Sequence, residues 1–309
     1  MKVAKALVVF LMRLFAQLPL KVHYALSRAV AWFAEKILRY RRSEVTANLA
    51  RSFPDKDYSE LKRLSHGFYL HLGRIIAETV WFSGSNSRRL RRSGIVRFEG
   101  LDELGALYES SPGVMVLMSH EGNWELYGGF ETYLGDNTLF DASNVVIVYL
   151  RQSSALWDSV MRTCRLGPMK DPASFEGYVE ARNVLRYALE RRSEKKVYNF
   201  IIDQYPYFPA KNHLHVNFMN QDTLTMKGAA DLACKLGMAV CYLSVQEKEG
   251  GGYVYKYVPM CPDASALGSA AIMQRFYDLL ASDLEAQPWN YLWSHRRWKV
   301  LNTSQVSQA

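Results

Sequence analysis

The sequence predicts an α/β fold with a mainly parallel, twisted sheet that is flanked by helices. From residue 94 onward, short runs rich in Val, Ile, Tyr and Phe alternate with longer stretches whose apolar residues recur at helical spacing. Strands that alternate with helices build parallel sheets covered on both faces. The 309 residues are 49% hydrophobic and 22% charged, which is a globular composition and argues against disorder or a polytopic membrane protein.

The individual elements follow from this periodicity. Upstream of the alternating region, residues 55–82 predict a long helix with Asp57 or Ser59 as its N-cap, and Gly237 is placed to end a later helix. The expected strands are 95–99, 114–118, 145–150, 197–202, 239–245 and 253–258, and the expected helices are 101–110, 124–134, 155–164, 176–191, 227–236 and 269–287.

The N-terminal segment differs from the rest of the chain. Residues 1–51 hold ten Lys or Arg and two Glu, so they carry essentially all of the formal charge of +8. Residues 3–20 are apolar but contain Lys5 and Arg13, and a spanning helix needs about 20 apolar residues. We therefore expect residues 1–54 to be a basic, hydrophobic segment that associates with a membrane, through an interfacial helix or a shallow anchor. The alternative is a pair of amphipathic helices packed on the domain of residues 55–309.

The most informative stretch, residues 118–125, reads Met-Ser-His-Glu-Gly-Asn-Trp-Glu and directly follows the buried strand 114–118. His120 and Glu125 thus lie on a turn at the carboxyl end of a strand, the usual ligand-binding edge of an α/β sheet. Residues five apart do not share a helix face, so these two side chains meet only if the backbone bends at Gly122-Asn123. The carboxylate would then orient the imidazole, which accepts a proton at neutral pH. The alternative is a histidine at a strand end and a solvated glutamate.

The stretch Ser119-His120-Glu121-Gly122-Asn123-Trp124-Glu125 resembles the signature of the lipid A late acyltransferases. The likeness extends over nearly the whole chain, in the family's order: Arg41-Arg42, Asn48-Leu49, Phe53-Pro54, Asp203-Gln204, and the ending that includes Pro288, Tyr291-Leu292-Trp293 and His295-Arg296-Arg297-Trp298-Lys299.

This resemblance implies a membrane-associated acyltransferase with a glycerophosphate-acyltransferase-like fold. It would work at the cytoplasmic face of the inner membrane and move a fatty acyl chain from an acyl carrier protein thioester to a hydroxyl of a lipid A precursor. In that chemistry, His120 acts as general base and Glu125 orients it. No covalent acyl-enzyme is required, because the chain lacks a Gly-x-Ser-x-Gly motif. The implied enzyme needs no cofactor.

Five further residues are expected to bind substrate. Arg151 follows the strand 145–150, and arginines near this position are thought to hold phosphate or developing negative charge in the family; a surface ion pair is the alternative. Arg182 is expected on the helix 176–191. Asp203 and Gln204 follow the strand 197–202 and should emerge at the same sheet edge, and Asn123 lies within the signature itself.

Other patterns receive a structural interpretation. His213-x-His215 has no third ligand nearby, so we predict no metal site. The terminal mixture of aromatic and basic residues is compatible with nucleic acid, but the near-neutral domain argues against it. The four cysteines are expected to be reduced. The basic run 88–92 is either a solvated turn or a contact with phosphates, membrane or an acidic carrier.

Two departures from the family pattern leave the acceptor open. Glu121 stands where phenylalanine is common and adds a carboxylate to the signature, and residues 205–209 are unusually aromatic. Either departure fits another acceptor, such as a phospholipid, an aminolipid or a polyene lipid. A non-catalytic membrane-bound lipid-binding protein and a thioester hydrolase are the alternatives from other classes.

Overall fold

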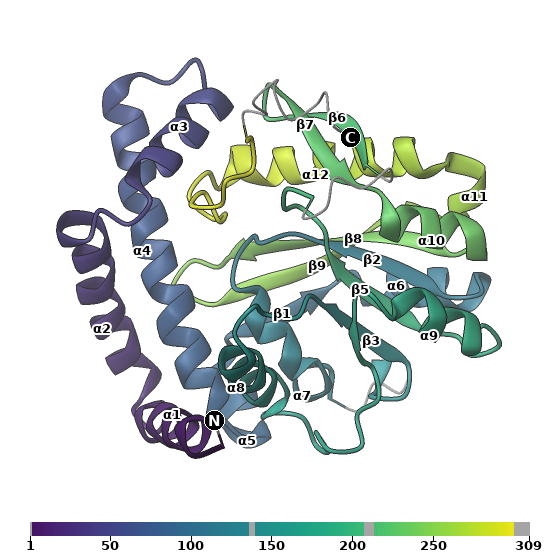
Figure 1. The fold of residues 1–309 in the computed structure, drawn as a ribbon, viewed down its shortest axis with the longest axis horizontal. Helices are drawn as coiled ribbons and strands as arrows, with labels where there is room; N and C mark the ends of the chain where they lie inside the picture. Colours follow the sequence, from purple (N-terminus) through teal and green to yellow (C-terminus); the bar gives the residue numbers. More distant parts are fainter. Residues whose placement is uncertain (1, 136–139, 207–212, 300–309) are drawn as a thin grey trace.

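A seven-stranded sheet forms the centre of the molecule (Figure 1). The computed structural model describes residues 2–135, 140–206 and 213–299. The strand order is β1-β9-β8-β2-β5-β3-β4, and β6 and β7 form a separate hairpin. The strands are β1 Val96–Glu99, β2 Val114–Met118, β3 Val145–Tyr149, β4 Tyr178–Glu180, β5 Val197–Ile201, β6 His213–Phe218, β7 Gln221–Met226, β8 Ala239–Glu247 and β9 Tyr253–Cys261.

Five neighbouring strands run in the same direction. β2 is parallel to β8 on one side and to β5 on the other, and β3 is parallel to both β5 and β4. β9 is antiparallel to β8 and parallel to β1, which reverses that side of the sheet. The carboxyl ends of β8, β2, β5, β3 and β4 therefore lie along one edge, and the residues that follow these strands are brought together there.

The sheet is buried on both faces, which explains the unbroken apolar sequence of β2. Val116 belongs to one core cluster with Leu104, whereas Met115 and Leu117 belong to the other with Ala230. Successive side chains of a strand point to opposite faces, so a strand that is covered on both sides must be apolar throughout. The predicted fold class, a mostly parallel sheet flanked by helices, is confirmed.

Helices cover the two faces of this sheet. α10, α11 and α12 lie on one side together with the β6–β7 hairpin, and α6 packs on β8 and β9 (Figure 1). The helices are α1 Lys2–Ala16, α2 Leu20–Trp32, η1 Phe33–Ile37, α3 Arg42–Ser52, α4 Tyr58–Ser83, α5 Ser87–Ser93, α6 Leu101–Ser110, η2 Trp124–Gly129, α7 Phe130–Leu134, α8 Ala155–Leu166, α9 Val184–Glu190, α10 Gly228–Leu236, α11 Ala264–Leu267 and α12 Ser269–Ala286.

The expected helix 176–191 is wrong in its first part. That range contains the short edge strand β4 and a turn, and helix α9 begins only at Val184. The hairpin β6–β7 was not expected either; its turn places Met219 and Asn220 at positive φ. The expected helix 124–134 is divided into the 3₁₀ helix η2 and the short helix α7. By contrast, Asp57 caps α4 in a capping box with Glu60, as one of the two predicted alternatives.

α2 packs along α4, and α1 packs against the end of α4 and against α8 (Figure 1). The Arg89 guanidinium donates to the backbone carbonyls of Ala16 and Leu18 and lies 5.1 Å from the centre of the Trp81 ring. These contacts hold the turn between α1 and α2 on the domain. The packing agrees with the alternative of amphipathic helices placed on the domain.

The outer surface of these helices remains apolar. In α1, the side chains of Val3, Leu7, Phe10 and Leu14 are each more than half exposed. Within the described residues, no single helix is long and apolar enough to cross a membrane; α1 and the α2–η1 segment satisfy the length and composition criterion only as a pair bent by 114°. Membrane association of residues 1–54 therefore stays a prediction.

The C-terminal residues after α12 return to the domain. Asn48 of α3 donates from its amide to the carbonyls of Trp293 and His295, and Arg297 is buried between Leu224 and Tyr277. The sequence elements that carried the family resemblance at the two ends of the chain are thus in direct contact.

Candidate active site

The carboxyl end of β2 places His120 at the polar edge of the sheet. Its Nδ1 lies 2.7 Å from Oδ1 of Asp203, which follows the neighbouring strand β5. The side chain of His120 is 16% exposed and that of Asp203 is 2% exposed, so the imidazole reaches solvent while its carboxylate partner is covered. The parallel pairing of β2 and β5 brings the two residues together across 83 positions of sequence.

The environment of Asp203 keeps it ionised. Burial opposes ionisation, but the attraction of His120 and the hydrogen bonds from His120 and Tyr291 outweigh it, so the pKa of Asp203 lies below its ordinary value. His295 lies nearby, and burial lowers its pKa to about 4, so this histidine is neutral at pH 7. An ionised carboxylate on Nδ1 holds the His120 ring in one orientation and stabilises its protonated form.

The second ring nitrogen of His120 faces Gln204, whose Nε2 lies 3.0 Å from Nε2 of the imidazole. When the glutamine amide donates this hydrogen bond, His120 Nε2 is the acceptor and Nδ1 carries the proton that Asp203 accepts. That tautomer leaves Nε2 unprotonated, which is the form a general base needs, with the Gln204 amide on it in this structure.

The expected direct contact between His120 and Glu125 is not made. Both carboxylate oxygens of Glu125 bind Arg165 on α8, at 2.5 and 2.6 Å. The 3₁₀ helix η2 turns Glu125 toward α8, whereas the nearby strand β5 supplies the carboxylate that reaches His120. Glu125 is connected to the histidine through Trp124, which donates to Glu125 from Nε1 and packs edge-on against the His120 ring at 4.6 Å.

Asn123 and Glu121 of the signature bind other parts of the fold. Asn123 is fully buried and donates its amide to Glu78, which does not fit the substrate contact expected for it. Glu121 is also fully buried, and it accepts hydrogen bonds from the Tyr242 hydroxyl and the Val245 backbone. Burial and the nearby Asp283 carboxylate raise the pKa of Glu121 well above its ordinary value. The carboxylate that Glu121 adds to the signature is therefore buried within the fold.

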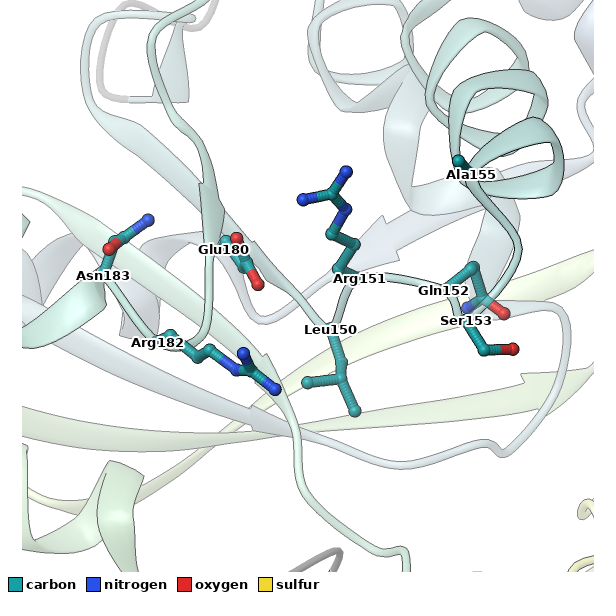
Figure 2. A pocket seen from close by; sticks show the side chains of 8 residues that line it. All are labelled: Leu150, Arg151, Gln152, Ser153, Ala155, Glu180, Arg182 and Asn183. Atoms are coloured by element: carbon teal, nitrogen blue, oxygen red, sulfur yellow. The ribbon is translucent and has the colours of Figure 1, made fainter. Parts of the chain in front are cut away.

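Arg151 and Arg182 line one pocket at the ends of β3 and β4 (Figure 2). The pocket has a volume of about 460 Å³, and Leu150 and Glu180 also contribute to its wall. Arg151 lies 4.0 Å from Asp158 and is mostly exposed, so that ion pair is weak. Arg182 comes from the turn after β4 and not from a helix, which corrects its predicted setting.

Two residues of the site were missed by sequence reasoning. Arg165 is the ion-pair partner of Glu125. Its place at the end of the predicted helix 155–164 gave no indication that it would bind this glutamate. Tyr291 lies inside the C-terminal motif and donates to Asp203. Of the patterns interpreted as structural, His215 binds Asp222 at an exposed position and the four cysteines are free. Of the aromatic stretch 205–209, which leaves the acceptor open, residues 207–209 lie outside the described residues.

The protein is an α/β protein with a mainly parallel sheet. At the strand ends of this sheet, the buried carboxylate of Asp203 contacts the partly exposed imidazole of His120, a pair that can accept and release a proton. The chain belongs to the bacterial lipid A biosynthesis acyltransferase family, whose family model matches residues 2–300. Membership of this family implies an acyltransferase that acts on a lipid. A search of curated proteins found no match.

Proposed function

We propose that this protein moves a fatty acyl chain from an acyl carrier protein thioester to a hydroxyl of a lipid A precursor, at the cytoplasmic face of the inner membrane. The observation that carries the proposal is the His120–Asp203 pair at the sheet edge where ligands bind: His120 belongs to the signature stretch, and Asp203 to a second stretch that resembles the family. The family match supports the lipid substrate and the acyl transfer.

In the proposed reaction, His120 Nε2 removes the proton from the acceptor hydroxyl as the oxygen attacks the thioester carbonyl. Asp203 stabilises the imidazolium that forms, which is the role that the family resemblance implies for Glu125. The tetrahedral oxyanion then collapses, the carbon–sulfur bond breaks, and the imidazolium returns its proton to the departing thiolate. Gln204, displaced from Nε2 by the acceptor hydroxyl, is free to donate its amide to the oxyanion.

Glu125 and Arg165 form the support for this base. Arg165 donates to both carboxylate oxygens of Glu125, and because Glu125 is only 8% exposed, its buried charge requires this guanidinium. The ion pair fixes Trp124, and Trp124 packs against the His120 ring. We infer that Glu125 contributes to catalysis by holding this indole in place.

The arginine-lined pocket fits an anionic group of the acceptor. β5 separates β2 from β3, and two strand spacings amount to about 10 Å. A phosphate held by Arg151 and Arg182 would therefore lie about one sugar ring or more away from a hydroxyl at His120. The exposed apolar surface of α1 and the basic N-terminal segment would place the site beside anionic lipids.

The test supplies purified protein with acyl carrier thioester, with and without a lipid A precursor, and follows both products by mass spectrometry. Parallel reactions replace the acceptor with a phospholipid or the donor with acyl coenzyme A. Acylated precursor formed from the carrier thioester supports the proposal. Acyl transfer only to another lipid contradicts the acceptor, release of free fatty acid in every reaction indicates a hydrolase, and no turnover with any pair indicates a lipid-binding protein.

A further inference from the structure

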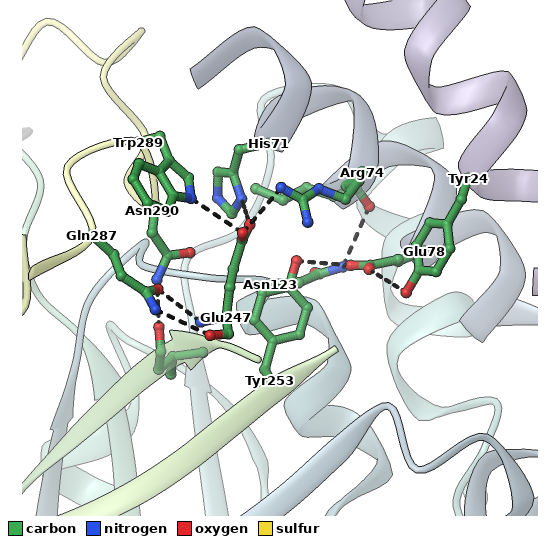
Figure 3. Close-up of polar contacts among 12 residues, drawn as sticks. Tyr24, His71, Arg74, Glu78, Asn123, Glu247, Tyr253, Gln287, Trp289 and Asn290 are labelled. Atoms are coloured by element: carbon green, nitrogen blue, oxygen red, sulfur yellow. Dashed lines mark hydrogen bonds and ion pairs between the residues drawn. The ribbon is translucent and has the colours of Figure 1, made fainter. Parts of the chain in front are cut away.

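Another buried carboxylate, Glu78 of α4, binds Asn123, which lies between His120 and Glu125 in the sequence (Figure 3). It is 1% exposed. Three donors converge on it: the Tyr24 hydroxyl at 3.0 Å, and the Asn123 amide and the Tyr253 hydroxyl, each at 2.9 Å. These donors come from α2, from the signature turn and from β9, so one buried side chain joins three separate parts of the fold.

Asn123 is the point at which this network reaches the active site. Its backbone carbonyl accepts a hydrogen bond from the Tyr255 hydroxyl, and its side chain is fully buried. The preceding Gly122 has φ +60°, and a Cβ there would lie 2.3 Å from Cγ1 of Val245. The backbone between His120 and Glu125 is therefore fixed by a left-handed glycine on one side and a buried amide on the other.

Glu247 is a neighbouring carboxylate that also binds α4 but does not bind the signature turn. Glu247 of β8 also binds α4, through His71 and Arg74, and it accepts a hydrogen bond from Trp289 (Figure 3). Among the described residues, the hydrogen bonds and ion pairs of the Glu247 carboxylate are to His71, Arg74 and Trp289, none of which belongs to the signature turn. Both carboxylates connect α4 to the sheet, but of the two only Glu78 also binds a residue of the signature turn, Asn123.

We propose that Glu78 is a positioning residue that acts through Asn123 to hold the His120 turn in its reactive geometry. This inference rests on the proposed acyl transfer. The Asn123 amide donates to Glu78 at 2.9 Å and, over a longer 3.4 Å, to the Ile75 carbonyl. A buried donor that loses its acceptor costs about 1–3 kcal/mol, so loss of the shorter bond favours a rotation of the Asn123 side chain that shifts the backbone beside His120. Through Tyr24, the same carboxylate links the apolar N-terminal helices to the site.

Two substitutions separate hydrogen bonding from packing. Glu78→Gln retains an oxygen that accepts from Asn123 and Tyr253, while its amide donates to the Tyr24 hydroxyl. Glu78→Met keeps the length of the side chain but accepts none of these bonds. Full-length variants are assayed for acyl transfer with both substrates varied, and their Tm is measured. Glu247→Met is the matched control, because it removes a similar set of bonds from the same helix.

We expect Glu78→Met to lower kcat at least tenfold with both KM values unchanged, and Glu78→Gln to remain within threefold of the parent protein. Glu247→Met should lower Tm with less than a threefold change in kcat. The double variant Glu78→Met with Asn123→Ala should lose no more kcat than the larger single loss, because the two residues act in series.

The proposal is overturned if Glu78→Met keeps kcat within threefold, if Glu78→Gln loses as much kcat as Glu78→Met, or if Glu247→Met loses kcat in parallel with Tm. If Glu78→Met does not fold, Asn123→Ala carries the test: a tenfold loss of kcat at constant KM supports positioning, and unchanged kcat overturns it. A parent protein that transfers no acyl chain instead refutes the proposed function, so the two failures are distinguishable.

Discussion

Replacing Asp203 with asparagine tests the pairing that organises the site. Asparagine has nearly the same shape but removes the charge from the 2.7 Å contact with His120 Nδ1. A hydrogen bond to a charged group contributes about 1.5–3 kcal/mol and a neutral one about 0.5–1.5 kcal/mol, so the charge itself accounts for about 1–1.5 kcal/mol. This difference predicts a loss of kcat of about 5- to 15-fold if geometry is kept. Asparagine that donates its amide to Nδ1 would enforce the wrong tautomer and deepen the loss.

The chain offers a matched control for this substitution. His215 and Asp222 form the same type of pair at 2.9 Å, but both side chains are more than half exposed. Steady-state acyl transfer and Tm are measured for Asp203→Asn and Asp222→Asn side by side. Asp222→Asn should leave both quantities unchanged. The reasoning is refuted if Asp203→Asn retains full kcat, or if both variants lose activity equally.

Three further predictions concern the surroundings of the pair. Arg165→Met leaves Glu125 buried without its cation, which should cost about 3–5 kcal/mol and lower both Tm and kcat; thermal unfolding that is unchanged would show the ion pair to be dispensable. Arg151→Ala and Arg182→Ala should each raise KM for a phosphorylated acceptor with little change in kcat; a lowered kcat at constant KM would place them in the chemistry. His295, whose pKa burial lowers from 6.5 to about 4, should make the parent protein lose stability as pH falls from about 6.5 to about 4, because only the unfolded chain binds the proton in that window; His295→Gln should flatten this dependence of Tm on pH.

The sheet was predictable because its strands are buried on both faces. β2 and α6 occur at the residues that periodicity indicates, since neither has a competing pattern. β4 is three residues long and lies beside a helical pattern, so local sequence gave no reason to separate it from α9. The β6–β7 hairpin turns at Met219-Asn220, and only Asn220 is of a residue type that favours the left-handed conformation.

The sequence placed His120, Asp203 and Gln204 at one sheet edge, but it did not predict which of their side chains pair, and it missed Arg165 and Tyr291. His120, Asp203 and Gln204 each follow a strand, and a parallel sheet brings such residues to one edge. Which carboxylate meets the imidazole depends on strand order, and the adjacency of β2 and β5 is a tertiary property. Glu125 is five residues from His120, yet the 3₁₀ turn directs it to Arg165.

The central claim is that His120 removes the proton from the acceptor hydroxyl, and the single-turnover rate of acyl transfer by His120→Gln tests it most directly. With saturating substrates, the rate constant should fall about 10²- to 10⁴-fold relative to the parent protein, while His215→Gln remains at the parent rate. A His120→Gln variant that transfers the acyl chain within tenfold of the parent rate would contradict the account.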